Sequence, residues 1–257
     1  MADWNPNQYL KFEDERTRPS VELLRRVPLV AAERCVDIGC GPGNSTELVA
    51  DRFPMAQVSG LESSPGMIAK AQERLPGLNF ELGDVSTWKP EHRFDLIFAN
   101  AVLQWVPNHS TLLPQLAHLL RPGGCLAIQM PNNHDEPSHQ LMREVAERGS
   151  WAGKLSAASS AKEQLGSLED YYAWLLATGC EVDIWQTTYV HPLSGARAIV
   201  EWFKSTGLKP YLDPLTSEER VAFEDTYEAA IADAYPAQAD GRVLLRFPRL
   251  FIVAQKR

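Results

Sequence analysis

The chain has 257 residues, of which 44% are hydrophobic and 23% are charged, and its formal net charge at pH 7 is −8. This length and composition predict a globular protein with one large α/β domain, or one such domain with a cap. The acidic balance argues against nucleic acid or an anionic membrane as a partner, and no apolar run reaches the roughly 20 residues that a membrane span requires.

Residues 34–131 have the pattern of alternating strands and helices. Strands are predicted at 34–40, 57–62, 78–84, 94–100 and 125–131, and helices at 44–53, 64–75 and 110–124. The first helix opens on Asn-Ser-Thr, which favours an N-cap, and the last ends at Pro-Gly-Gly. Apolar strands alternating with helices indicate a parallel sheet that is covered on both faces.

The pattern changes after residue 131. Residues 134–179 and 194–241 have helical periodicity, whereas 180–193 and 242–257 are strand-like. We expect the two late strands to pair antiparallel and to complete the sheet, so that the core comprises residues 1–133 together with these strands. The two helical segments are then cap insertions over one edge of the sheet.

The cysteines indicate a reducing compartment. No two of them have the Cys-x-x-Cys spacing of a zinc site, and Cys35 and Cys40 flank a glycine-rich turn as small apolar residues would. The first 18 residues lack the apolar segment of a secretory signal. We therefore expect a cytoplasmic protein without a metal site.

The glycine-rich turn, VDIGCGPGNST at 36–46, follows the first predicted strand. Its Gly39, Gly41 and Gly43 have neither the G-x-G-x-x-G spacing of dinucleotide-binding proteins nor the lysine of a P-loop. Ligands of open parallel sheets bind at the carboxyl ends of the strands. The turn therefore predicts that backbone approaches a ligand closely, although a glycine turn that binds nothing is the alternative.

Polar side chains end four successive predicted strands. Asp37 precedes the turn and suits an ammonium group or the orientation of the turn itself. Glu62, 19 residues after Gly43, suits the two ribose hydroxyls of a nucleoside. Asp84 suits the exocyclic amine of adenine, and Asn100 closes the fourth strand. Each residue alone also fits a helix cap, but together they predict an adenosine with a charged tail and no pyrophosphate.

Five motifs occur in order over roughly residues 30–131: VDIGCGPGNST, GLESS, GDV, FDLIFANAVLQWV and LLRPGGCLAIQMPNN. In order and spacing they resemble the class I S-adenosylmethionine-dependent methyltransferases. The resemblance implies a Rossmann-like sheet of seven strands, mostly parallel with the last antiparallel, with a helical cap. It also implies S-adenosylmethionine as cofactor and S-adenosylhomocysteine as product, and adds Val85 to the cofactor-binding residues. Many relatives have Asp at the position of Glu62, which preserves the hydrogen bonding.

Further segments, among them FANAVLQWVPNH, QMPNNHDEPSHQLMREVA and LLRFPRLFIVA, are similar to members of that family that methylate a carboxylate of trans-aconitate. The similarity covers most of the chain except residues 150–163. It implies a small-molecule tricarboxylate substrate, a monomethyl ester product and in-line displacement. No general base is obligatory, because a carboxylate with a pKa near 4 is already ionised at pH 7. No obligate protein partner is evident.

Such chemistry predicts cations around the two non-reacting carboxylates and weaker donors near the third. Gln104 and Trp105 follow the fourth strand and are the catalytic candidates. Gln104 is a neutral donor, and the Trp105 ring attracts a sulfonium by cation–π interaction unless it is only a core aromatic.

Candidate substrate-binding residues lie in the N-terminal segment and in the cap. Some have a structural alternative. The N-terminal arginine can belong to a solvated helix end that pairs with Glu13, Asp14 and Glu15, and Asn132 can form a turn. An extended RFPRLF directs only one of Arg246 and Arg249 inward. The predicted set is Arg18, Asn132, Arg197, Lys204 and Arg246.

Three other functions stay open at this point. The chain can be a class I O-methyltransferase acting on another small acid or a hydroxyl, although no buried acid stands out as the base that a hydroxyl requires. It can also bind S-adenosylmethionine without catalysis, against which the basic cap argues. A nicotinamide-dependent reductase is disfavoured by the glycine spacing.

Overall fold

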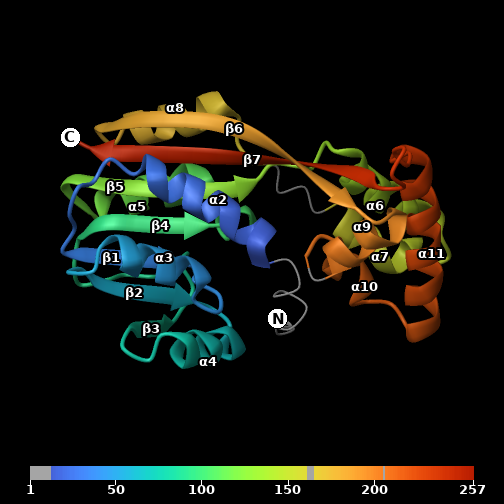
Figure 1. The fold of residues 1–257 in the computed structure, drawn as a ribbon, viewed down its shortest axis with the longest axis horizontal. Helices are drawn as coiled ribbons and strands as arrows, with labels where there is room; N and C mark the ends of the chain where they lie inside the picture. Colours follow the sequence, from blue (N-terminus) through green and yellow to red (C-terminus); the bar gives the residue numbers. More distant parts are fainter. Residues whose placement is uncertain (1–12, 161–164, 205) are drawn as a thin grey trace. The chain divides into compact units, whose positions relative to one another are not determined.

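The computed structural model describes residues 13–160, 165–204 and 206–257 (Figure 1). The chain forms two compact units, each made of segments that are separate in the sequence. Of the described residues, the first unit comprises 13–131, 165–187 and 250–257, and the second comprises 132–160, 188–204 and 206–249. Residues 165–179, which the sequence pattern assigned to the cap, thus lie in the first unit. Within the described ranges, no helix is long and apolar enough to cross a lipid bilayer.

The first unit is built on a seven-stranded sheet with the order β3-β2-β1-β4-β5-β7-β6. Strands β1 to β5 are parallel to one another, whereas β7, which lies next to β5, runs in the opposite direction (Figure 1). This mostly parallel sheet with an antiparallel last strand confirms the predicted fold class. The strands are β1 (Arg34–Ile38), β2 (Gln57–Glu62), β3 (Asn79–Leu82), β4 (Phe94–Asn100), β5 (Leu120–Pro131), β6 (Cys180–Leu193) and β7 (Val243–Lys256).

Strand β4 shows how the sheet is buried on both faces. Its consecutive residues Leu96, Ile97, Phe98 and Ala99 are all fully buried, although side chains alternate between the two faces of a strand. The helical elements of this unit are α2 (Glu13–Arg26), α3 (Asn44–Arg52), α4 (Pro65–Arg74), the 3-10 helix η1 (Leu103–Trp105), α5 (His109–His118) and α8 (Leu168–Leu176).

The predicted helix at 110–124 is wrong at its C-terminal end. Helix α5 stops at His118, and β5 begins at Leu120, before the Pro-Gly-Gly sequence. The register between β4 and β5 shifts from Phe94 opposite Leu120 to Leu96 opposite Cys125. Pro-Gly-Gly therefore forms an irregularity within β5, where Gly123 has a φ of +79° that glycine adopts without strain.

The second unit is helical apart from the ends of β6 and β7. Helix α11 packs against α6 and α9, and α6 packs against α7. The fully buried rings of Phe223 and Tyr227 on α11 and Phe203 on α9 form part of its core. The helices are α6 (Pro137–Arg148), α7 (Ala152–Ser160), α9 (Ala196–Lys204), α10 (Lys209–Leu212) and α11 (Ser217–Ala234).

Candidate functional site

The glycine-rich turn connects β1 to α3, and two of its three glycines serve different purposes. Gly39, Gly41 and Gly43 have φ values of +65°, +53° and +93°. A Cβ on Gly39 would lie 2.2 Å from Cγ2 of Val102, so this glycine is required by packing. A Cβ on Gly41 would meet nothing within 4 Å. Gly41 therefore presents bare backbone to open space, which is what a ligand contact requires.

Asp37, at the end of β1, is buried beneath the turn. Its Oδ2 accepts hydrogen bonds from Ser45 Oγ at 2.6 Å and Thr46 Oγ1 at 2.7 Å. The N-cap of α3 is Gly43, so the predicted capping by the Asn-Ser-Thr sequence is wrong: two of these side chains bind Asp37 instead. Ser45 and Thr46 lie eight and nine residues after Asp37, so these bonds span the whole turn.

Two opposing effects act on the pKa of Asp37. Burial raises its pKa to about 7, although the two hydroxyl donors act in the opposite direction. Its Oδ1 is buried and accepts no hydrogen bond from any residue that the structure describes. An unsatisfied buried carboxylate oxygen is costly, and a cationic or N–H donor of a ligand would satisfy it.

Glu62 joins the end of β2 to the glycine turn. Its Oε2 accepts from Gly41 N at 3.1 Å, and its Oε1 accepts from Ser63 N at 2.7 Å and Ser64 N at 2.9 Å. The parallel register of Ile38 opposite Leu61 brings the two strand ends together. The carboxylate predicted for the ribose hydroxyls therefore lies beside the glycine that faces open space.

Asp84 follows β3, the neighbour of β2 in the sheet. It is exposed, and its Oδ1 accepts from Ser86 N at 2.8 Å and Ser86 Oγ at 2.7 Å, which lowers its pKa. Gly83 N donates to Glu62 O at 2.9 Å, which holds the two loops together. Val85 is half-buried against the apolar core, as a residue beneath an adenine ring would be.

The segment after β4 supplies two further acceptors. Asn100 Oδ1 and Gln104 Oε1 are both buried, and neither has a hydrogen-bond partner among the described residues. Gln104 Nε2 donates to Ala101 O at 2.8 Å, so this donor, predicted to face the attacking oxygen, is engaged within its own loop. Trp105 is 47% exposed on η1 and is not a core aromatic.

These groups converge because of the strand order. Strands β3, β2, β1 and β4 are adjacent and parallel, so their carboxyl ends meet at one edge of the sheet (Figure 1). Three orphaned acceptors, Asp37 Oδ1, Asn100 Oδ1 and Gln104 Oε1, belong to this edge. Such a set fits a ligand rich in N–H and O–H donors, as the predicted adenosine with a charged tail is.

The predicted substrate cations mostly have acidic neighbours. In the first unit, Arg18 is exposed and pairs with Glu22 at 2.8 Å, an acid of the same helix that was not among the three considered for it. In the second unit, Arg197 contacts Glu224 at 3.1 Å and Glu228 at 3.0 Å. A substrate carboxylate at these positions would have to displace an existing ion pair.

Lys204 and Arg246 also lie beside acidic side chains. Lys204 Nζ lies 2.8 Å from Glu224 and 2.7 Å from Glu201, while the side chain of Arg246 is 64% exposed and lies 3.7 Å from Glu136. Asn132 is half-buried, and its N–H donates to Pro248 O at 2.9 Å.

Arg249 differs from these cations because it is only 4% exposed. Its guanidinium lies 4.7 Å from the centroid of the Phe247 ring. The expectation that only one arginine of RFPRLF points inward agrees with this burial, but the inward residue is Arg249 rather than Arg246. Sequence alternation alone does not say which of two faces is buried.

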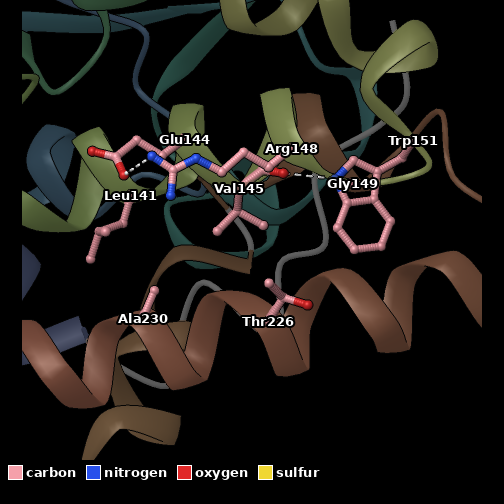
Figure 2. Close-up of a pocket in the computed structure, with 8 residues that line it drawn as sticks. All are labelled: Leu141, Glu144, Val145, Arg148, Gly149, Trp151, Thr226 and Ala230. Atoms are coloured by element: carbon pink, nitrogen blue, oxygen red, sulfur yellow. Dashed lines mark hydrogen bonds and ion pairs between the residues drawn. The ribbon is translucent and has the colours of Figure 1, made fainter.

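A separate pocket lies between α6 and α11 in the second unit (Figure 2). Leu141, Val145 and Trp151 line one side, and Thr226 and Ala230 line the other. None of the predicted site residues that the structure describes contributes to it. In the described part of the chain, no group of three His, Cys, Asp or Glu side chains is placed to hold a metal ion.

Known proteins resemble this chain over its whole length. A family model described as a methyltransferase domain matches residues 35–124. A trans-aconitate 2-methyltransferase of Methylobacterium nodulans is 60% identical over 256 residues, which cover 100% of this chain and 99% of that protein. A protein of the same name from Variovorax paradoxus is 53% identical over 258 residues and 100% of both chains.

Solved structures share the fold at low sequence identity. The YcgJ protein of Bacillus subtilis has a TM-score of 0.59 at 16% identity, covering 93% of this chain and 99% of that one. Phosphoethanolamine N-methyltransferase 2 of Haemonchus contortus, solved with phosphomonomethylethanolamine and S-adenosylhomocysteine, has a TM-score of 0.55 at 19% identity, covering 93% and 53%. These neighbours confirm the predicted class I methyltransferase fold.

Proposed function

The chain belongs to the trans-aconitate 2-methyltransferase family, and we propose on this basis that it transfers a methyl group to a carboxylate of trans-aconitate. The products are the monomethyl ester and S-adenosylhomocysteine. The observation that carries the proposal is the 60% identity to a trans-aconitate 2-methyltransferase over the whole chain, second unit included. The second unit matters here because substrate choice differs among enzymes that share the first unit's fold.

S-adenosylmethionine supplies the methyl group when it is bound. We assign its binding to the edge of the sheet where four strands end, on the residues predicted for it: Asp37, Gly39, Gly41, Gly43, Glu62, Asp84, Val85 and Asn100. The bare backbone of Gly41, the adjacent Glu62 carboxylate and the orphaned Oδ1 of Asp37 support this assignment. An ammonium group at Asp37 would hold its carboxyl group in the ionised form.

The reaction requires little acid–base catalysis from the protein. The attacking group is a carboxylate that is ionised at neutral pH, so the chain does not have to remove a proton. Its contribution is to orient the acceptor and to exclude water, and positioning of this kind contributes up to roughly 7–11 kcal/mol in favourable cases. We assign Gln104 and Trp105, on the η1 segment after β4, to that task.

The remaining carboxylates of the substrate require cations. Arg249 is our preferred residue, because it is a buried guanidinium in the second unit and can bind a carboxylate in bidentate fashion. Arg197 and Lys204 already face three glutamates between them, so their predicted role requires an exchange of partners.

A cytoplasmic location belongs to the same proposal. Cys35, Cys40, Cys125 and Cys180 are all free thiols and all buried, as expected of a protein kept in a reducing compartment. The net charge of −8 supports a small-molecule substrate rather than nucleic acid.

The test is to identify the product. Purified protein, S-adenosylmethionine and trans-aconitate should give an acid that is heavier by one methyl group, together with an equal amount of S-adenosylhomocysteine. Hydroxylamine should cleave the product, because it is an ester. Binding of S-adenosylhomocysteine without any methylated product would contradict the proposal and favour a non-catalytic binding protein.

A further inference from the structure

His109, the first residue of α5, bonds with both ring nitrogens. Its Nε2 lies 2.8 Å from Leu103 O, and its Nδ1 lies 2.7 Å from the hydroxyl of Tyr171. A carbonyl oxygen only accepts, so Nε2 carries the hydrogen and donates to Leu103. Nδ1 of the neutral ring is then an acceptor and receives the O–H of Tyr171. Both polar atoms of the imidazole are satisfied in one defined tautomer.

Tyr171 extends this arrangement to α8. The side chain is fully buried, and its hydroxyl oxygen accepts from Gly166 N at 3.2 Å. Its ring packs edge-on against Trp174, with the ring centroids 5.4 Å apart. Three hydrogen bonds in series therefore run from Gly166 through Tyr171 and His109 to Leu103. They connect two segments of the first unit that lie more than 60 positions apart in the sequence.

The series ends on a short segment that has few backbone hydrogen bonds of its own. Leu103 opens η1, a single 3-10 turn, in which Trp105 N donates to Val102 O and Val106 N donates to Leu103 O. Ala101, just before it, has a φ of +55°, which non-glycine residues seldom adopt. Short 3-10 turns and residues in such conformations persist only when their surroundings fix them.

We propose that His109 and Tyr171 are positioning residues for methyl transfer. They fix the carbonyl of Leu103, and thereby the placement of Gln104 and Trp105, which are the next two residues of η1. This inference rests on the proposed function, since it assigns a task to the same site. Neither residue needs to touch the substrate: His109 acts through Leu103, and Tyr171 acts through His109.

The test compares Tyr171→Phe with a matched control, Tyr227→Phe. Tyr227 is also fully buried, and its hydroxyl also donates one hydrogen bond, to Ser138 O at 2.9 Å, but within the second unit. For Tyr171→Phe we expect kcat with trans-aconitate to fall about 10-fold, since small misplacements in a positioned site cost up to about 100-fold. The Kd for S-adenosylhomocysteine should stay within about twofold of wild type, because the residues assigned to cofactor binding are not displaced. Tyr227→Phe should keep the wild-type kcat.

A pair of variants at His109 separates positioning from general loss of structure. In His109→Gln the side-chain amide can still reach Leu103 O, whereas in His109→Asn it is too short. We expect His109→Gln to retain several-fold more kcat than His109→Asn at similar thermal stability. If the two residues act in one series, Tyr171→Phe should add little to the effect of His109→Asn.

Hydrogen exchange gives a readout that needs no substrate. A peptide covering residues 101–106 should exchange faster in Tyr171→Phe than in wild type or Tyr227→Phe, while peptides from β1 and β2 should not change. Wild-type kcat and wild-type exchange in both Tyr171→Phe and His109→Asn would overturn the inference. If wild-type protein methylates no acid, the proposed function fails, but the exchange comparison still decides whether this pair fixes η1.

Discussion

Replacing Gly41 by alanine tests the location of the cofactor most sharply. The backbone cost is modest: a left-handed conformation costs an L-residue about 1–2 kcal/mol, and the smaller entropy of the unfolded alanine chain offsets about 0.4–1 kcal/mol of it. The φ of Gly41 is +53°, and its new Cβ would meet no protein atom within 4 Å. We therefore expect a net loss of about 1 kcal/mol in the free energy of unfolding, or about 2–4 °C in Tm.

The effect on binding should be larger than the effect on stability. If S-adenosylhomocysteine lies against Gly41, the added methyl group overpacks the contact, at a cost of about 1–3 kcal/mol. Such a cost raises the Kd for S-adenosylhomocysteine by about 5- to 150-fold. Isothermal titration calorimetry measures this directly, because it requires no turnover.

Gly123 offers a control with matched strain. Its φ is +79°, a Cβ there would also meet nothing within 4 Å, and it lies near the start of β5 rather than at the carboxyl ends of the strands. Gly123→Ala should lose similar stability and keep the wild-type Kd. If Gly41→Ala binds S-adenosylhomocysteine as tightly as Gly123→Ala does, the open space at Gly41 is not the cofactor site and the reasoning fails.

Three further predictions concern the charged groups. Burial raises the pKa of Asp37 from 3.8 to about 7. Between pH 3.8 and about pH 7 the folded protein therefore binds a proton that the unfolded chain has lost. The free energy of unfolding of the ligand-free protein should fall as pH rises through this window. Urea unfolding at pH 5 and pH 7.5 should show that slope in wild type and a smaller one in Asp37→Asn; equal slopes would mean that Asp37 is ionised throughout. Glu62→Ala removes the acceptor of three backbone N–H groups. The loss of charge-assisted hydrogen bonds should raise the Kd for S-adenosylhomocysteine at least about 10-fold. An unchanged Kd would exclude a contact between Glu62 and the ribose. Arg249→Ala should raise the KM for trans-aconitate at least about 10-fold. Arg197→Ala breaks exposed ion pairs and should change the KM less than about twofold. If steady-state kinetics give the larger KM change for Arg197→Ala, Arg197 rather than Arg249 is the substrate ligand.

The fold of the first unit could be predicted from the sequence because it follows from local sequence patterns. An apolar run such as 94–100 predicts a buried strand wherever it lies, and the order of such runs predicts a parallel sheet. The polar residues that end four of these strands were predicted to meet at one edge, and the strand order brings those ends together. Local pattern and tertiary structure agree here, which is what makes the prediction possible.

Other features depended on contacts between distant residues. Ser45 and Thr46 read as helix caps, but the buried Asp37 competes for their hydroxyls. Helix α8 has the same periodicity as the helices on either side of it, and only its packing against α5 assigns it to the first unit.

Charge pairing is equally invisible in a sequence. Arg197 and Lys204 look like free cations until α9 and α11 fold together and bring Glu224 beside both. Likewise, alternation along RFPRLF separates Arg246 from Arg249 without saying which face is buried.

The most direct test of the central claim is the choice of acceptor. Release of S-adenosylhomocysteine should be measured with trans-aconitate, cis-aconitate, citrate and isopropylmalate as separate substrates under identical conditions. The account predicts the highest kcat/KM for trans-aconitate among the four acids. Equal rates with all of them, or no release with any while S-adenosylhomocysteine still binds, would leave the methyltransferase fold standing and contradict the proposed substrate.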